Sequence, residues 1–187
     1  MAADYLIASL QPLTFDGAAP YTKARFVEMC RDQLAARDAD AIAALLETGL
    51  GTPSTPIAAK WVDLETQMRN AVATARAQAL GQDAARWQHP TTGCALAWTN
   101  RIASAFQEKD TGRRDRLLDL VRWDAAGELT PPAAPLSAAA AYTYAIRLGI
   151  VLRRQHLSTE AGNAAFTRLT AATKLELDAA PAKENSI

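Results

Sequence analysis

The feature that most constrains this chain is a long uninterrupted stretch, Ile57–Leu80, which reads IAAKWVDLETQMRNAVATARAQAL. It contains no Pro or Gly and is rich in Ala, Leu, Gln, Arg and Met, which favour helix. Apolar residues recur in it at steps of three or four, and this spacing places them on one helix face. The stretch therefore predicts a long helix that Gly81 ends. Its apolar face comprises Trp61, Leu64, Met68, Val72, Ala75 and Ala79.

A second row on the same stretch is polar and carries Glu65, Arg69, Asn70 and Arg76. Glu65 and Arg69 are four residues apart with the acid first, the order that favours an ion pair on a helix. Asn70 is unusual in a helix interior, because its side chain competes for backbone hydrogen bonds. Two interpretations stay open: Asn70 bonds a neighbouring helix or loop, or it faces water.

The rest of the sequence predicts further helices between loops that contain Pro and Gly, and so an all-α array of six to eight helices. Tyr5–Leu10 is too short for periodicity to distinguish a strand from a helical turn. Asp110-Thr111-Gly112 is interpreted as a short break between helices. The other predicted helices run from a Thr22 cap to Ala36, from an Asp38 cap to Gly49, from Cys94 to Glu108, from Arg113 to Ala126, from a Ser137 cap to Gln155, and onward from a Ser158 cap.

These elements predict a single helical domain over residues 1–177, with a subdivision near 49–56 left open at the linker GLGTPSTP. We expect a disordered tail at 178–187. Both cysteines, Cys30 and Cys94, sit among apolar residues at helical spacing. This setting predicts two buried thiols in a reducing compartment rather than a disulfide.

The charge balance argues neither for nucleic acid nor for an acidic partner, since the 187 residues hold 20 basic and 20 acidic side chains. No stretch reaches the roughly 18 apolar residues of a membrane span. The N-terminal MAADYLIASLQPL lacks the basic region of a secretory signal. We therefore expect a cytoplasmic protein that meets a membrane only through a partner.

The sequence shows no pattern typical of catalysis. It has no Gly-rich phosphate loop and no G-x-S-x-G nucleophile motif. The candidate metal ligands Cys30, His89, Cys94 and His156 match no common zinc spacing. We therefore expect no enzyme activity, no metal and no cofactor.

Two clusters of basic residues suit a solvated face or a protein interface better than nucleic acid. Aspartates interrupt the first cluster, which favours ion pairs. Arg122-Trp123 places a cation beside a large amphipathic ring, a pairing common both at interfaces and at the wet edges of cores. The first cluster is Arg113, Arg114, Arg116 and Arg122, interleaved with Asp115, Asp119 and Asp124; the second is Arg147, Arg153 and Arg154.

A set of motifs, in order, resembles an uncharacterised bacterial family encoded beside V-type rotary ATPase genes. Their order and spacing carry the resemblance, which covers nearly the whole chain before the tail. The sequence departs from the family pattern between Gln82 and Thr111, and at Met68, where Leu is usual. The motifs are YLIASLQPLTF, Phe26 and Cys30 as F-x-x-x-C, Trp61, Glu65, Arg69 and Asn70 as W-x-x-x-E-x-x-x-R-N with Arg76-Ala77, LLDLVRW ending at Trp123, and Ala141–Leu148 leading to Arg153, Ser158, Glu160 and Gly162.

That family is similar in turn to the C-type (also called d-type) central-stalk component of archaeal and vacuolar rotary ATPases. The resemblance implies a non-catalytic central-stalk adaptor that links the rotor stalk to the membrane ring of proteolipids. It implies other V-type ATPase subunits as partners and a location peripheral to the inner membrane. The candidate interface or structural residues are Trp61, Glu65, Arg69, Asn70, Arg76, Arg113, Arg114, Arg122 and Trp123.

Two alternatives come from other classes of function. The first is a free-standing helical scaffold or regulator. The second is a small-molecule enzyme with a helical core, for which Arg69, Asn70 and convergent carboxylates would have to line a pocket.

Overall fold

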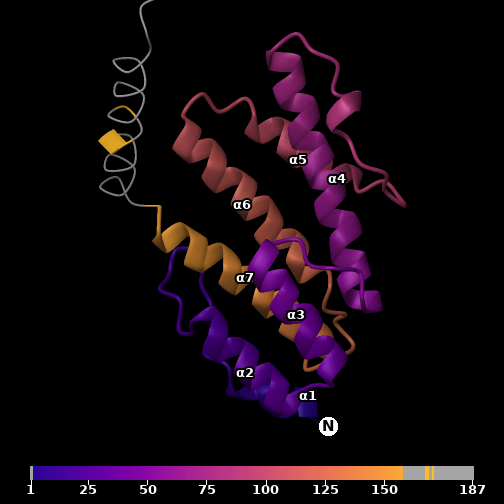
Figure 1. The fold of residues 1–187 in the computed structure, drawn as a ribbon, viewed down its shortest axis with the longest axis vertical. Helices are drawn as coiled ribbons and strands as arrows, with labels where there is room; N and C mark the ends of the chain where they lie inside the picture. The colour runs from indigo at the N-terminus through magenta and orange to yellow at the C-terminus, as the bar shows by residue number, and fades with distance from the viewer. Residues whose placement is uncertain (1, 158–166, 169, 171–187) are drawn as a thin grey trace, which may run out of the picture. The chain divides into compact units, whose positions relative to one another are not determined.

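A computed structural model describes residues 2–157, 167–168 and 170, and within them the chain is all-α with no strand (Figure 1). Its contacts divide the chain into two units, 1–152 and 153–187. The helix predicted after Ser158 and the tail at 178–187 lie outside the described residues. The helices are α1 (Ala2–Ser9), α2 (Lys23–Gln33), α3 (Ala36–Thr48), α4 (Pro56–Ala79), α5 (Leu96–Ala105), α6 (Thr111–Gly127) and α7 (Ala138–Gln155), with a short 3-10 helix η1 (Ala85–Trp87).

Several helix ends follow directly from local sequence. Thr22 and Thr55 cap α2 and α4, since each hydroxyl accepts a backbone N–H three residues on. Gly49 and Gly81 follow α3 and α4 with φ of 72° and 64°, a conformation that glycine adopts without steric cost. The open question at Tyr5–Leu10 is answered by α1, which covers most of that segment as helix.

Three predicted helix starts are wrong in detail. Asp38 does not cap α3: Ala35 occupies the cap position, and the Asp38 carboxylate accepts a hydrogen bond from Tyr142. Asp110 caps α6 by accepting the Arg113 N–H at 2.7 Å, so Thr111 and Gly112 belong to the helix. Ser137 precedes α7, but its hydroxyl finds no partner among the described residues.

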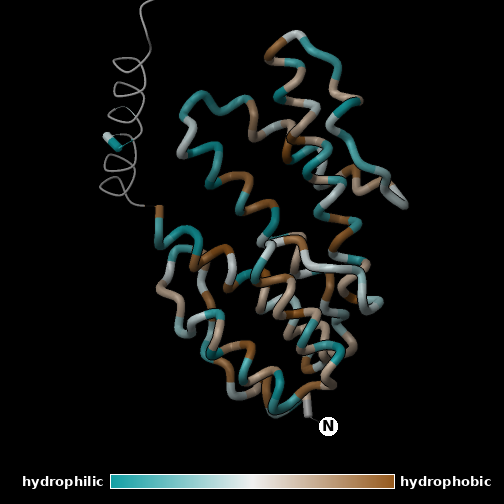
Figure 2. Tube along the Cα trace, viewed as in Figure 1, coloured by the Kyte–Doolittle hydropathy of each residue, from teal (hydrophilic) through white to brown (hydrophobic). Residues whose placement is uncertain are grey.

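The core of residues 2–152 is built from helix faces whose largest fully buried side chains are Trp61, Tyr142 and Phe26. Hydropathy alternates along each helix, while the segment between α4 and α5 is mostly hydrophilic (Figure 2). The predicted face of α4 is buried at Trp61, Leu64 and Met68 but opens toward its last turn, where Ala79 is exposed. Most of α4 therefore packs as predicted, and its C-terminal end projects toward solvent.

Tyr142 links three helices through one chain of hydrogen bonds. Its hydroxyl donates to Asp38 Oδ1 on α3 at 3.0 Å and so accepts from Thr55 Oγ1 at 2.9 Å. Thr55 Oγ1 in turn accepts the Ala58 N–H at the start of α4. Burial raises the pKa of Tyr142, which keeps the phenol protonated and able to donate.

Helices α4 and α6 run antiparallel, and a polar contact joins the start of one to the end of the other. Lys60 Nζ near the start of α4 donates to the Glu128 carbonyl at the end of α6 at 3.0 Å. Helix α5 packs against both helices and adds two bonds to α6, from Trp98 to Glu128 and from Arg101 to Asp124. Figure 1 shows α4, α5 and α6 together in one half of the 2–152 unit.

The prediction of two buried thiols is right for Cys30 and wrong for Cys94. Cys30 lies on α2 in the core, where burial raises the pKa of its thiol to about 12. Cys94 is exposed because it precedes α5, which begins at Leu96, and so does not join the helix face of Ile102.

This difference predicts selective thiol labelling. At about pH 7, an aromatic disulfide reagent should modify Cys94 rapidly and Cys30 only after denaturation, because the thiolate is the reactive form. Absorbance gives the rate and peptide mass spectrometry gives the site, with Cys94→Ser as the control. Equal labelling of both cysteines in the native protein would contradict the packing of α2.

Candidate functional site

The centre of the candidate site is Glu65, a carboxylate on α4 that is buried against α6. Its side chain is 3% exposed. Arg69 Nε on the same helix lies 2.8 Å from Oε1, and Arg122 Nε on α6 lies 3.1 and 3.0 Å from the two oxygens. Arg122 Nη1 also donates to the Leu118 carbonyl at 3.4 Å. The carboxylate therefore accepts from two helices at once and joins them.

The two arginines do not hold Glu65 equally. The Arg122 side chain is 22% exposed and reaches both carboxylate oxygens, whereas Arg69 is 47% exposed and reaches one. Removing a carboxylate from water costs several kcal/mol unless close opposite charge and hydrogen bonds compensate. Because water screens Arg69 more, Arg122 provides the larger part of that compensation. The Glu65–Arg69 pair was predicted from spacing, while the contact across to α6 was not.

A second feature lies on a neighbouring face of α4, where the chain returns along the helix from Gln88 to Ala95; we call these residues the return segment. Asn70 Nδ2 donates to the His89 carbonyl at 2.8 Å, and its Oδ1 accepts the His89 N–H at 2.9 Å. Gln88 Nε2 donates to Thr74 Oγ1 at 2.9 Å. Asn70 therefore satisfies both main-chain groups of one loop residue, which confirms the first of the two interpretations of this residue.

Asp63 and Gln67 continue these bonds toward the start of α5. Asp63 Oδ1 accepts from the Thr92 N–H at 2.6 Å and from its hydroxyl at 3.0 Å, and Oδ2 accepts from Gln67 at 2.7 Å. Gln67 Oε1 accepts the Ala95 N–H at 2.5 Å. The backbone bond from Thr92, followed by the two side-chain bonds, lowers the pKa of Asp63 against the opposing effect of burial.

Sequence reasoning missed the role of Asp63 and Gln67, although a signal for it exists. Asp63, Gln67, Asn70 and Thr74 follow at steps of four, three and four, so they form a polar stripe along one face of α4. Such a stripe beside a long Pro- and Gly-containing connection is able to bond that connection.

The other sequence-predicted residues are dispersed. Trp61 is a core residue, and its indole nitrogen has no partner among the described residues. Arg76 is exposed in the last turn of α4, and Arg113 is exposed in the first turn of α6. Arg114 lies over the Phe106 ring at 5.3 Å.

The cation beside Trp123 is Arg147 of α7 and not its sequence neighbour Arg122. The Arg147 guanidinium lies 4.9 Å from the ring centroid, and its Nε donates to the Trp123 carbonyl at 3.2 Å. Phe15 meets the ring edge-on at 5.5 Å. Consecutive helix residues point about 100° apart, so Arg122 and Trp123 serve different faces of α6.

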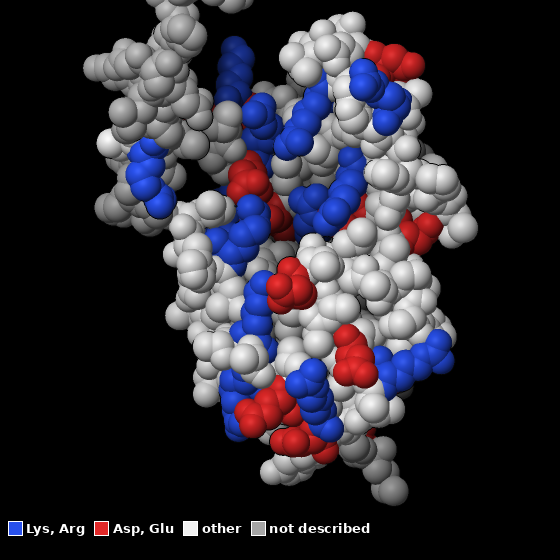
Figure 3. Space-filling view, in the orientation of Figure 1, with Lys and Arg blue, Asp and Glu red and all other residues white. Residues whose placement is uncertain are grey.

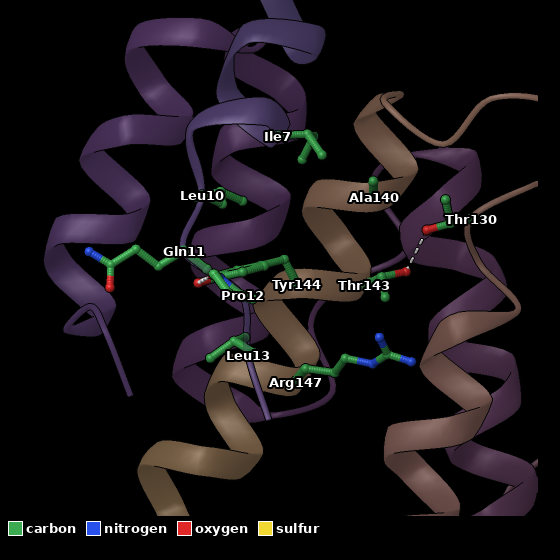
Figure 4. Close-up of a pocket in the computed structure, with 10 residues that line it drawn as sticks. All are labelled: Ile7, Leu10, Gln11, Pro12, Leu13, Thr130, Ala140, Thr143, Tyr144 and Arg147. Atoms are coloured by element: carbon green, nitrogen blue, oxygen red, sulfur yellow. Dashed lines mark hydrogen bonds between the residues drawn. The ribbon is translucent and has the colours of Figure 1, made fainter. Parts of the chain in front are cut away.

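A pocket of about 260 Å³ lies elsewhere, between the α1–Pro12 segment and α7 (Figure 4). In Figure 4 the Thr130–Thr143 hydroxyl pair and Arg147 lie on one side and Ile7, Leu10 and Leu13 on the other. Its lining contains neither Asn70 nor Arg69 and no carboxylate. It therefore does not match the pocket that the enzyme alternative requires.

Comparison of the chain with protein-family models, curated proteins and solved structures finds no match. Within the described residues, no group of three or more His, Cys, Asp or Glu side chains is placed to hold a metal ion. None of the described helices is both long and apolar enough to span a membrane.

The unequal hold on Glu65 gives a stability prediction. Arg122→Met should lower the free energy of unfolding by about 3 kcal/mol, because it leaves a buried carboxylate with one screened partner. Arg69→Met should cost about 1 kcal/mol. Urea unfolding followed by circular dichroism measures both, with the exposed Arg76→Met as control. Equal losses at Arg69 and Arg122 would contradict the larger contribution of Arg122.

The bonds to Asp63 give a prediction about pH. A carboxyl whose pKa is lowered by folding stabilises the fold above its ordinary pKa of 3.8, and that contribution is lost as pH falls through the lower folded value. Asp63→Asn should therefore destabilise by about 1 kcal/mol near pH 7 and by much less near pH 2. Unfolding measured at both pH values tests this, with exposed Asp32→Asn on α2 as control. A deficit that is independent of pH would contradict the assignment.

Proposed function

We propose that this chain is a non-catalytic structural subunit of a bacterial V-type rotary ATPase, similar to the C-type central-stalk component, that links the rotor stalk to the proteolipid ring. Its partners would be the stalk and ring subunits, and its place would be peripheral to the inner membrane through the complex. The motif resemblance and the all-α fold support this proposal.

The observation that carries the proposal is how the resembling residues are used inside the fold. Glu65, Arg69 and Arg122 join α4 to α6, and Asn70 fixes the return segment. Trp61 is buried in the core. These residues therefore serve cohesion between helices, a property that an adaptor needs if it is to transmit force between two partners without unfolding.

Because several candidate residues already serve internal contacts, fewer of them remain to contact partner subunits. Glu65, Arg69 and Asn70 of the polar row of α4, and Arg122 of α6, are occupied by internal contacts. The remaining candidate residues, Arg76, Arg113 and Arg114, form no ion pair with a described residue. We assign contact with partner subunits to these arginines and a structural role to Trp61, Glu65, Asn70 and Arg122.

Co-purification from the native host tests the proposal. The chain would be tagged at its chromosomal locus, membranes would be extracted with a mild detergent, and eluted proteins would be identified by mass spectrometry. We expect the rotor-stalk and proteolipid subunits to elute with it, because torque transfer requires interfaces larger than those of transient complexes. A tagged cytoplasmic protein of similar abundance is the control.

A chain that never elutes with those subunits, even after mild crosslinking, would overturn the proposal. A stable symmetric dimer of the isolated chain in light scattering would favour the free-standing scaffold instead, because a two-fold dimer does not fit a single-copy position on a stalk.

A further inference from the structure

Charge is unevenly distributed along this neutral chain. Residues 69–117 hold eight Lys and Arg but four Asp and Glu side chains, whereas residues 2–68 hold five and nine. The first range comprises the C-terminal half of α4, η1, α5 and the first turns of α6, which lie together in the fold. We call the surface formed by residues 69–117 the basic end. Figure 3 shows Lys and Arg side chains gathered over the upper part of this face, where those elements lie.

Aromatic rings of the basic end hold three of its arginines in place. Arg86 lies 5.0 Å over Trp87, Arg101 lies 5.1 Å over Trp98, and Arg114 lies 5.3 Å over Phe106. A guanidinium stacked on a ring has lost part of its rotamer freedom and keeps its N–H edge available for planar carboxylates. Arg86, like Arg76, Arg113 and Arg114, forms no ion pair with a described residue. Arg86 and Arg114 are therefore oriented before any partner binds, whereas Arg101 already pairs with Asp124.

Exposed apolar side chains are concentrated in the same range. Leu80, Leu96, Trp87 and Leu117 are 71%, 60%, 42% and 38% exposed, and they are four of the seven large apolar side chains exposed among the described residues. Leu80 ends α4, and Trp87 belongs to η1. Arginine and tryptophan are enriched in the binding hot spots of protein interfaces.

We propose that the basic end binds an acidic, leucine-bearing α-helix of a protein partner, with carboxylates on the arginines and leucines on the exposed apolar side chains. Among the described residues this part of the fold has no strand edge, so recognition must come from side chains. Asp83, Asp110 and Asp115 lie among the arginines and would repel a continuous row of phosphates. A protein helix is able to avoid them by placing its acids at intervals.

The inference does not depend on the rotary ATPase assignment, because it concerns the chemistry of the partner and not its identity. Binding of an acidic helix with no co-purification would sustain this inference and remove the proposed function. Co-purification without binding of an acidic helix would support the proposed function and overturn this inference.

The test uses the full chain and a fluorescein-labelled helical peptide of about 20 residues, with leucine at every third or fourth position and glutamate between. A peptide with lysine in place of each glutamate is the control. We expect the glutamate peptide to bind at least about tenfold more tightly, measured by fluorescence anisotropy, and to weaken as salt rises.

Matched charge-reversal variants test whether the basic end is the surface that binds the peptide. Arg76→Glu with Arg86→Glu should weaken binding at least about tenfold, while the same charge change on α2, Lys23→Glu with Arg31→Glu, should change it less than about twofold. Leu80→Ser should weaken binding about threefold through lost apolar contact. All of these side chains are exposed, and circular dichroism melting checks that each variant folds.

Four results would overturn the inference. These are equal binding of the two peptides, equal loss in the α2 variant, tighter binding to phosphatidylserine vesicles or to a single-stranded oligonucleotide, and self-association of the chain that Arg76→Glu with Arg86→Glu abolishes. The last result would assign the surface to a second copy of this chain, whose residues 2–68 are acidic.

Discussion

A buried carboxylate that accepts hydrogen bonds from arginines on two helices is the constraint on which the arrangement of α4 and α6 depends. Glu65 is almost fully buried, so the position of α6 is limited to those that bring Arg122 within hydrogen-bond distance. Lys60, one turn from the start of α4, adds a second contact to the end of α6. Two helices held only by apolar contacts are able to slide along each other. Two polar contacts at different positions along the helix axes fix the register between them.

The same helix also organises the chain that follows it. From Asp63 to Thr74, α4 offers carboxylate, amide and hydroxyl groups that replace the hydrogen bonds a loop would otherwise make with water. The return segment therefore keeps exposed side chains while much of its backbone is fixed. As a result, α5 starts from a defined point beside Gln67 and packs between α4 and α6.

The parts of the fold that the sequence predicted are those determined by local rules. The long helix, the Thr22 cap and the Gly49 stop each depend on residues within one or two turns. The errors arose where a distant group decided the outcome. Aspartate is a favourable N-cap residue, but the Asp38 carboxylate instead accepts a hydrogen bond from Tyr142, which is more than a hundred residues away in the sequence. Gly112 looked like a break, although a glycine in the first turn costs a helix capped by Asp110 little.

In the candidate site, too, the sequence predicted a contact within one helix and missed contacts between helices. Spacing was sufficient to pair Glu65 with Arg69, because both lie on one helix. Nothing local identified Arg122 as their partner, or Arg147 as the cation on Trp123, because those contacts form between helices that meet only in the folded chain. The motif order placed Trp61, Glu65, Arg69 and Asn70 in one group. In the fold, all four help to hold α4 against the elements around it.

The hydrogen bonds along the return segment also determine where the connection between α4 and α5 tolerates inserted or deleted residues. Thr74 and Asn70 hold Gln88 and His89, and Asp63 and Gln67 hold Thr92 and Ala95, so the return segment is fixed to α4, while residues 81–87 form a bend before it. Added or lost residues in that bend alter loop closure by only a fraction of a kcal/mol. One such residue after Gln88 would shift His89, Thr92 and Ala95 out of step with the polar stripe. The bend, which carries Arg86 and Trp87, therefore tolerates a change in length that the return segment does not, and the helices behind it would stay in place.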